Sequence, residues 1–158
     1  MRIYLLRHGI AEDAKAGMPD ADRRLTPDGI QRLERFLKRV RALGIQPDVV
    51  ASSRLRRAVE SARIAAKVLG YKGEIVTLQH VAPESDPAQA WSELGELREF
   101  EQILVASHEP FLSSLYAYLL DSPSLNVRVK KGSLGCIDVE PGRRPAGELR
   151  WLLPPGLE

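Results

Sequence analysis

The chain alternates between short apolar runs of strand length and longer segments whose apolar residues recur every three or four positions. The clearest longer segment begins at Thr26-Pro27, where threonine suits a helix N-cap and proline the first helical position, and it ends at Gly44. Its apolar residues fall on one helix face: Ile30, Leu33, Phe36, Leu37, Val40 and Leu43. Helices are expected over residues 27–43, 54–69, 88–100 and 111–120. Strands are expected over residues 3–6, 49–51, 75–78, 103–106, 134–139 and 149–153.

Strand and helix alternate through most of the chain, an order typical of a three-layer α/β/α sandwich around a mostly parallel central sheet of about six strands. The wholly apolar run 103–106 fits a central strand with both faces covered. The last two strands are expected to pair across the turn-rich segment 141–145. A length of 158 residues, without repeats or a linker, predicts one domain over residues 1–158.

Polar residues follow three of these strands directly. Arg7-His8-Gly9 comes after the first strand, Arg57 lies just beyond the second, and His108 follows the fourth. Because the carboxyl ends of parallel strands lie at one edge of a sheet, two histidines and two arginines are expected to converge there. Paired guanidinium groups beside an imidazole suit a phosphate group, so the sequence predicts an enzyme that acts on phosphate.

In order and spacing these residues resemble the histidine phosphatase superfamily, also called the phosphoglycerate mutase-like family. Its Arg-His-Gly motif matches residues 7–9, its Ser-Pro-x-x-Arg-Ala motif matches residues 53–58 except that Arg54 replaces the proline, and its second histidine is His108. The stretches Arg-Leu-Thr-x-x-Gly at 24–29 and Ser-His-x-Pro at 107–110 are most similar to the short SixA-type phosphohistidine phosphatase branch. The resemblance implies a phosphoglycerate mutase-like fold.

The resemblance also implies a role for each residue. His8 would attack phosphorus and form a covalent phosphohistidine that water hydrolyses, with a backbone carbonyl holding its other ring nitrogen. Arg7 and Arg57 would bind the phosphate oxygens through their donor forks, and His108 would add a further donor in the transition state. Such a phosphatase needs neither a metal nor a cofactor.

Other residues have two interpretations each. Glu84 is the nearest candidate for a general acid, together with Asp86, which is equally suited to capping the following helix. Arg23 either reaches the phosphate or forms a salt bridge at the rim. Ser53 and Ser107 are either pocket hydroxyls or turn and cap residues.

The choice of substrate follows from the leaving group and from size. The short branch often lacks the acid, and phosphohistidine does not require one, because its free ring nitrogen can be protonated near neutral pH. A chain without a large lid insertion leaves the pocket open to a side chain of another protein. We therefore expect a phosphohistidine protein phosphatase. The alternatives are a small-molecule phosphomonoesterase acting on a sugar or metabolite phosphate and a non-catalytic phosphate-binding interaction module.

Composition limits the classes of binding partner that we expect for this chain. The 23 Lys+Arg and 21 Asp+Glu residues give a net charge of +2, which does not favour non-specific nucleic-acid binding. No apolar stretch is long enough for a signal peptide or a membrane span, so we expect a cytoplasmic protein without a membrane partner. Cys136, the single cysteine, lies in an apolar run and is expected to serve packing.

Overall fold

A six-stranded sheet runs through the centre of the computed structural model, which describes residues 1–156. Its strands are β1 (Arg2–Arg7), β2 (Val49–Ser52), β3 (Val76–Thr77), β4 (Gln102–Ser107), β5 (Leu134–Asp138) and β6 (Glu148–Leu153). They are arranged in the order β3-β2-β4-β1-β5-β6. The β2–β3, β2–β4 and β1–β4 pairs are parallel, whereas β5 is antiparallel to both β1 and β6. The prediction of a mostly parallel sheet with a central fourth strand is confirmed.

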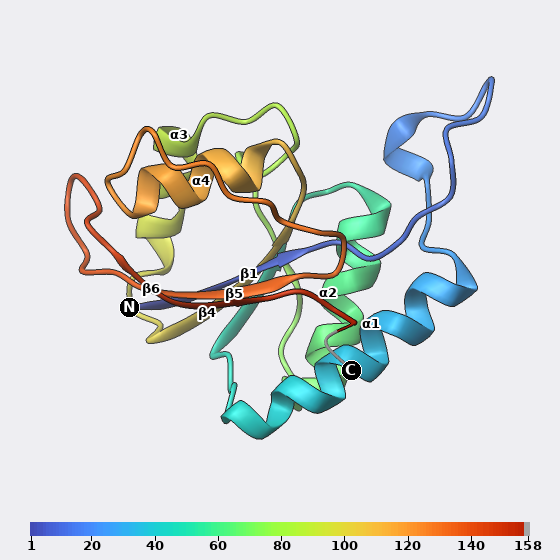
Figure 1. Ribbon diagram of the computed structural model, residues 1–158, viewed down its shortest axis with the longest axis horizontal. Coiled ribbons are helices and arrows are strands. Elements are labelled where there is room, and N and C mark those ends of the chain that lie inside the picture. The colour runs from blue at the N-terminus through green and yellow to red at the C-terminus, as the bar shows by residue number, and fades with distance from the viewer. Residues whose placement is uncertain (157–158) are drawn as a thin grey trace.

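Helices cover both faces of the sheet. They are α1 (Pro27–Val40), α2 (Arg56–Leu69), α3 (Pro87–Leu94) and α4 (Phe111–Leu119), with 3-10 turns η1 (Asp20–Asp22), η2 (Arg41–Leu43) and η3 (Gly95–Leu97). Figure 1 shows α1 and α2 on one face and α3 and α4 on the other, which is the predicted three-layer sandwich. In the described part of the chain, no helix is long and apolar enough to cross a membrane.

The apolar runs are continuous because alternate residues enter different cores. Ile3 and Leu5 pack in the core under α3 and α4. Tyr4 and Leu6, pointing the other way, pack in the core under α1 and α2. A strand buried on both faces therefore loses the alternation of apolar and polar residues that a half-exposed strand would have. Cys136 is buried in the second of these cores, so its predicted packing role agrees with the structure.

Several predicted element ends differ from the structure. The helix predicted over 27–43 ends at Val40 before the 3-10 turn η2, and the helix predicted over 54–69 begins at Arg56. Two further differences concern the elements predicted over 88–100 and 75–78. The helix predicted over 88–100 ends at Leu94 and tightens into the 3-10 turn η3. Leu97 and Phe100 still pack against the core, which explains why apolar spacing continues past the end of the helix. The strand predicted over 75–78 lies at an edge of the sheet and is paired with β2 only at Val76 and Thr77. All these errors concern element ends, where hydrophobic spacing carries the least information.

One packing contact in the core under α3 and α4 depends on a glycine, which has no side chain. Tyr116 of α4 is fully buried, and its hydroxyl has no hydrogen-bond partner among the described residues. Its ring and hydroxyl lie against Gly135 of β5, where an added Cβ would overlap the Tyr116 oxygen. The close approach of α4 to β5 therefore requires glycine at position 135.

We predict that Gly135→Ala lowers the free energy of unfolding by about 2 kcal/mol or more, because the new methyl group overpacks a rigid core. Adding Tyr116→Phe should recover part of this loss, since it removes the nearest overlapping atom. Urea denaturation measures both effects. Gly95→Ala is the control, because a Cβ there meets nothing within 4 Å. Wild-type stability in Gly135→Ala would show that the contact is softer than described.

Candidate active site

The carboxyl edge of the parallel strands brings the four predicted residues together. His8 follows β1 and His108 follows β4, and their ring centroids are 5.1 Å apart. Arg57 lies in the first turn of α2, just after β2, and Arg7 is the last residue of β1. The positive charges of both arginines act on the pKa values of both imidazoles. His8, Arg57 and His108 are 6%, 3% and 1% exposed, so the cluster is buried beneath the protein surface.

A backbone contact fixes the tautomer of His8. Its Nδ1 lies 2.7 Å from the carbonyl oxygen of Gly9. A carbonyl oxygen can only accept, so Nδ1 carries the proton and Nε2 holds a free lone pair. Burial lowers the pKa of His8 to about 4, assisted by the charges of Arg57 and Arg7 and opposed by the Gly9 hydrogen bond. His8 is therefore neutral and nucleophilic at neutral pH.

His108 is oriented by a hydroxyl group. Its Nε2 lies 2.6 Å from Ser53 Oγ, which also accepts a hydrogen bond of 3.3 Å from the Leu55 amide. When the Ser53 hydroxyl donates its proton to Nε2, the imidazole proton lies on Nδ1. The Nδ1 atom is buried and has no partner among the described residues. Burial, together with His8 and Arg57, lowers the pKa of His108 to about 3.

Each arginine is held by hydrogen bonds from its outer Nη atoms, whereas its Nε atom makes none to the described residues. Arg7 donates from Nη1 to the carbonyl oxygen of Val129 at 2.7 Å. Arg57 donates from Nη1 and Nη2 to the backbone oxygen and the carboxylate of Asp20, at 3.0 and 3.1 Å. The Nε atoms of both arginines are buried without a partner in the described structure. Burial lowers the pKa of both guanidinium groups, but they remain charged at any physiological pH.

In the described part of the chain, three buried nitrogens at this site have no hydrogen-bond partner: Arg7 Nε and Arg57 Nε, which can only donate, and His108 Nδ1, which donates when Nε2 accepts from Ser53. An unsatisfied buried polar group costs about 1–3 kcal/mol, so such groups are kept where a ligand or water completes them. The charges of Arg57 and Arg7 both act on the pKa of His8, and the His108 ring lies 5.1 Å from the His8 ring. A tetrahedral oxyanion offers several acceptor atoms at once and fits this donor set.

Asp20, which sequence analysis did not identify, links the site to its rim. Its carboxylate accepts from Arg57 on one oxygen and from Arg23 Nε on the other, at 2.8 Å. Arg23 also donates to the backbone oxygen of Glu12. Arg23 therefore forms the salt bridge that was one of its two interpretations. The spacing of three residues between Asp20 and Arg23 in a polar loop was the available signal.

The segment before β5 was also missed. Gly132 donates its amide to the backbone oxygens of Arg7 and His8, and Arg7 donates its amide to Ser133. Because β5 runs antiparallel to β1, its first residues lie at the same edge as the carboxyl end of β1. The basic run Arg128-Val129-Lys130-Lys131 directly before an apolar strand was a signal for this position.

The remaining candidates lie outside the cluster. Glu84 is exposed in a turn and makes no hydrogen bond or ion pair with the described residues, while Asp86 caps α3 by accepting from Ala88. Ser107 donates its hydroxyl proton to the carbonyl of Val81 and ties that loop to β4. Of the two serine hydroxyls, Ser53 is the one that hydrogen-bonds to a histidine ring among the described residues.

The Leu-Thr-x-x-Gly stretch holds the loop after His8 against α1. Thr26 donates its amide to the Ile10 carbonyl and accepts from the Gly29 amide as the N-cap of α1. A Cβ on Gly29 would overlap the backbone oxygen of Ile10, so glycine permits this close approach. Gly9 is fixed from the other side, because its amide donates to Ser61 of α2.

Residues 3–81 match the sequence model of the histidine phosphatase superfamily (branch 1). The chain belongs to this superfamily. It is also 33% identical over 115 residues to an uncharacterized protein of Picosynechococcus sp., covering 71% of this chain and 68% of that protein.

Solved structures of other histidine phosphatases share the fold. The protein histidine phosphatase SixA complexed with tungstate superposes with a TM-score of 0.83 at 20% identity, over 97% of this chain and 96% of that one. A putative phosphohistidine phosphatase SixA from Agrobacterium tumefaciens gives a TM-score of 0.81 at 20% identity, covering 98% and 97% of the two chains. The alpha-ribazole phosphatase from Shigella flexneri gives 0.74 at 21% identity, with 96% of each chain covered.

We predict that His8 and His108 titrate with midpoints near pH 4 and pH 3 in the folded protein, well below the value of about 6.5 for an unfolded chain. Two-dimensional NMR of the imidazole carbons across an acid titration measures this directly. Because the unfolded state takes up these protons first, the free energy of unfolding should fall as the pH drops from about 6.5 toward 4. Midpoints near 6.5 would mean that water reaches the imidazoles freely.

Proposed function

We propose that this histidine phosphatase removes the phosphoryl group from phosphohistidine in a protein, through a covalent intermediate on His8. One observation carries the proposal: a neutral histidine with a free Nε2 stands beside three buried nitrogens, of Arg7, Arg57 and His108, that have no partner within residues 1–156. A phosphoryl group supplies both the electrophile for Nε2 and the oxygens for those nitrogens.

In the first step, the lone pair of His8 Nε2 attacks phosphorus, and the bond from phosphorus to the substrate imidazole breaks. The bonding electrons pass to the leaving nitrogen. Since the other nitrogen of that ring already carries a proton near neutral pH, the ring leaves as neutral imidazole. Arg7 and Arg57 hold the phosphoryl oxygens, and His108 adds a hydrogen bond as negative charge shifts in the transition state.

In the second step, water attacks the phosphoryl group on His8, and the bond between phosphorus and Nε2 breaks. The electrons return to Nε2, and phosphate leaves as dihydrogen phosphate with both protons of the water. Throughout, Nδ1 of His8 keeps its proton and donates it in the hydrogen bond to the Gly9 carbonyl, which stabilises the cationic ring of the intermediate. The neutral His8 is then ready for another turnover.

The surroundings of the site support a phosphorus–nitrogen substrate. An alkoxide leaving group would need a proton donor, yet Glu84 makes no described contact with His8 or His108. The carboxylate paired with Arg57 is Asp20. Burial raises its pKa, but Arg23 and Arg57 together lower it further than burial raises it, so it stays ionised. An ionised carboxylate cannot donate a proton, whereas imidazole leaves without one.

The alternative is a small-molecule phosphomonoesterase with the same fold. It is favoured by the relatives of similar fold that are named as alpha-ribazole phosphatase and phosphoserine phosphatase. The structures named as SixA superpose with higher TM-scores, which supports the first proposal.

The proposal is tested by phosphate release from a panel containing a phosphohistidine protein, free phosphohistidine and common phosphomonoesters. We expect preference for the phosphohistidine protein, and an acid-labile phosphoryl group trapped on His8 by rapid quench and peptide mass spectrometry. His8→Ala should abolish both signals with an unchanged circular dichroism spectrum, while His80→Ala, at an exposed position, should keep them. Turnover in folded His8→Ala would overturn the mechanism, and preference for phosphomonoesters would favour the alternative.

The phosphate clamp gives a separate prediction. Arg57→Lys keeps the positive charge but loses the planar donor fork, so kcat/KM should fall by roughly 100-fold, the loss typical of one transition-state donor. Arg56→Lys is the matched control, because Arg56 points to the surface and pairs with Glu60, and it should stay close to wild type. If Arg57→Lys retained most of the activity, Arg57 would not bind the phosphoryl group.

A further inference from the structure

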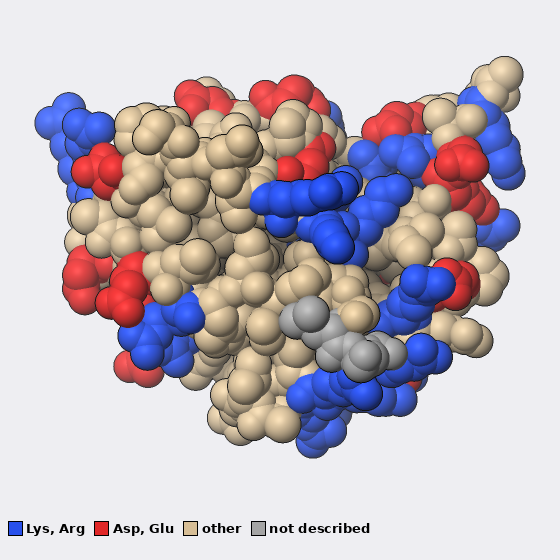
Figure 2. All heavy atoms as spheres, in the orientation of Figure 1, with Lys and Arg blue, Asp and Glu red and all other residues tan. Residues whose placement is uncertain are grey.

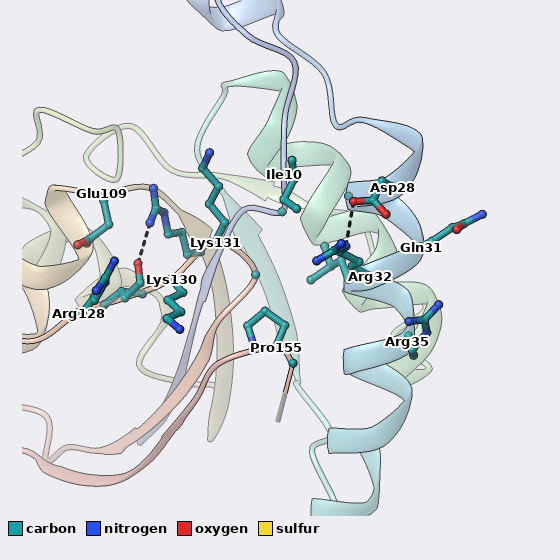
Figure 3. A pocket seen from close by; sticks show the side chains of 17 residues that line it. Ile10, Asp28, Gln31, Arg32, Arg35, Glu109, Arg128, Lys130, Lys131 and Pro155 are labelled. Carbon is teal, nitrogen blue, oxygen red and sulfur yellow. Dashed lines mark hydrogen bonds and ion pairs between the residues drawn. The ribbon is translucent and has the colours of Figure 1, made fainter. Parts of the chain in front are cut away.

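A groove with a volume of about 910 Å³ opens beside the phosphate-binding residues, and the catalytic chemistry proposed above does not use it. The groove reaches the site at Arg7 and Gly9. One wall is α1 and the other is the segment 128–132 that precedes β5, as Figure 3 shows. A single phosphoryl group and an imidazole ring would leave most of this volume empty, so a bound substrate can extend along it.

The walls of the groove are strongly basic. Its lining contains six cationic side chains and two carboxylates, whereas the whole chain has a net charge of only +2. Figure 2 shows lysine and arginine side chains gathered along the hollow on this face. The positive charge of the protein is therefore concentrated where a substrate would lie, rather than spread evenly over the surface.

Most of these cations have no carboxylate of their own. Arg32 pairs with Asp28 on α1. Among the described residues, no acidic side chain forms an ion pair with Arg35, Arg128 or Lys130, and all three are exposed. Exposed cations on opposite walls repel one another weakly, and a ligand with several negative charges relieves that repulsion.

Between its basic walls, the groove is lined by residues that would let a substrate polypeptide approach the protein closely. Most of the other lining residues are small or apolar and bring no charge: Gly9, Gly29, Gly132, Leu33, Ile10 and Pro155. In Figure 3, Pro155 lies between the wall with Lys130 and Lys131 and the wall with Arg32. A lining of small and apolar residues between two basic walls suits a polypeptide segment with acidic side chains on both sides.

We propose that this groove binds acidic residues flanking the phosphohistidine of the substrate protein, and so selects phosphohistidines that lie in an acidic surface. The inference rests on the proposed function, because the phosphoryl group at Arg7 anchors the segment that enters the groove. Each exposed contact is weak alone, and several together raise the association rate and lower KM while leaving kcat nearly unchanged. The groove is thus a determinant of substrate choice rather than part of the chemistry.

The test compares two synthetic peptides with one phosphohistidine, one flanked by Asp and Glu and the other by Asn and Gln. We expect kcat/KM for the acidic peptide to exceed that for the amide peptide by about tenfold or more at low salt, and the ratio to shrink as salt rises. In a triple variant, Arg35→Glu, Arg128→Glu and Lys130→Glu, the ratio should fall to about one or invert. Rates on p-nitrophenyl phosphate, measured alongside, report whether the phosphate site is intact.

Arg98→Glu is the matched control, because it reverses an exposed charge next to η3, outside the groove. It should leave the ratio of the two peptides unchanged. Equal kcat/KM values for the two peptides in the wild type would overturn the proposal. It would also be overturned if Arg98→Glu lowered the ratio of kcat/KM values as much as the triple variant does, because the effect would then come from overall charge.

A second measurement separates this inference from the proposed function. The same two peptides, with a non-hydrolysable phosphonate in place of phosphohistidine, are used as inhibitors of p-nitrophenyl phosphate hydrolysis. Stronger inhibition by the acidic phosphonate, lost in the triple variant, would support the groove even if neither phosphohistidine peptide were hydrolysed, in which case only the proposed function fails. Equal inhibition by an oligonucleotide of similar charge would overturn the inference, because the groove would then be a general polyanion site.

Discussion

The parallel register between β1 and β4 is the constraint on which the site depends. Arg7 pairs with Ser107, so the next residue of each strand, His8 and His108, leaves the sheet at the same level. The amide of His8 extends this pairing by donating to the Ser107 carbonyl. Because side chains alternate along a strand, a shift of one residue would turn one of the imidazoles away from the other. The register is fixed by apolar residues that fill both cores, so packing far from the edge determines the distance between the two rings.

Burial and charge act together at this edge. Both imidazoles are buried beside two guanidinium groups, and each effect disfavours a protonated ring, so His8 is held neutral where its lone pair is needed. The arginines are stabilised by acceptors at their outer nitrogens, the Val129 carbonyl and Asp20. Their buried Nε atoms have no partner among the described residues. The protein therefore holds each guanidinium group by its outer nitrogens and leaves the inner one without an acceptor, which is the arrangement that the proposed function uses.

Much of the fold was predictable because the hydrophobic spacing within each segment agrees with the place of that segment in the sheet or helix layers. Apolar spacing identified the helices and strands, and the rule that parallel strand ends share one edge was sufficient to group the four residues. Asp20 and the segment 128–133 were not found. Their positions depend on how a polar loop folds over α2 and on the direction of β5, and neither is encoded in hydrophobic spacing. The shortened helix at Leu94 has a related cause, because Leu97 and Phe100 face the core from a 3-10 turn as well as they would from a helix.

The contacts that fasten the beginning and the end of the loop after His8 have a consequence for how such a protein can diversify. Ala11 pairs with Leu25, and the Thr26 amide donates to Ile10, so the intervening chain leaves the fold and returns at one point. Closing a longer or shorter excursion between fixed ends changes the free energy only slowly with length. The stretch between Ala11 and Leu25 therefore behaves as an exchangeable module. Its length and sequence can change to suit a new substrate without moving His8, provided that a carboxylate remains opposite Arg57.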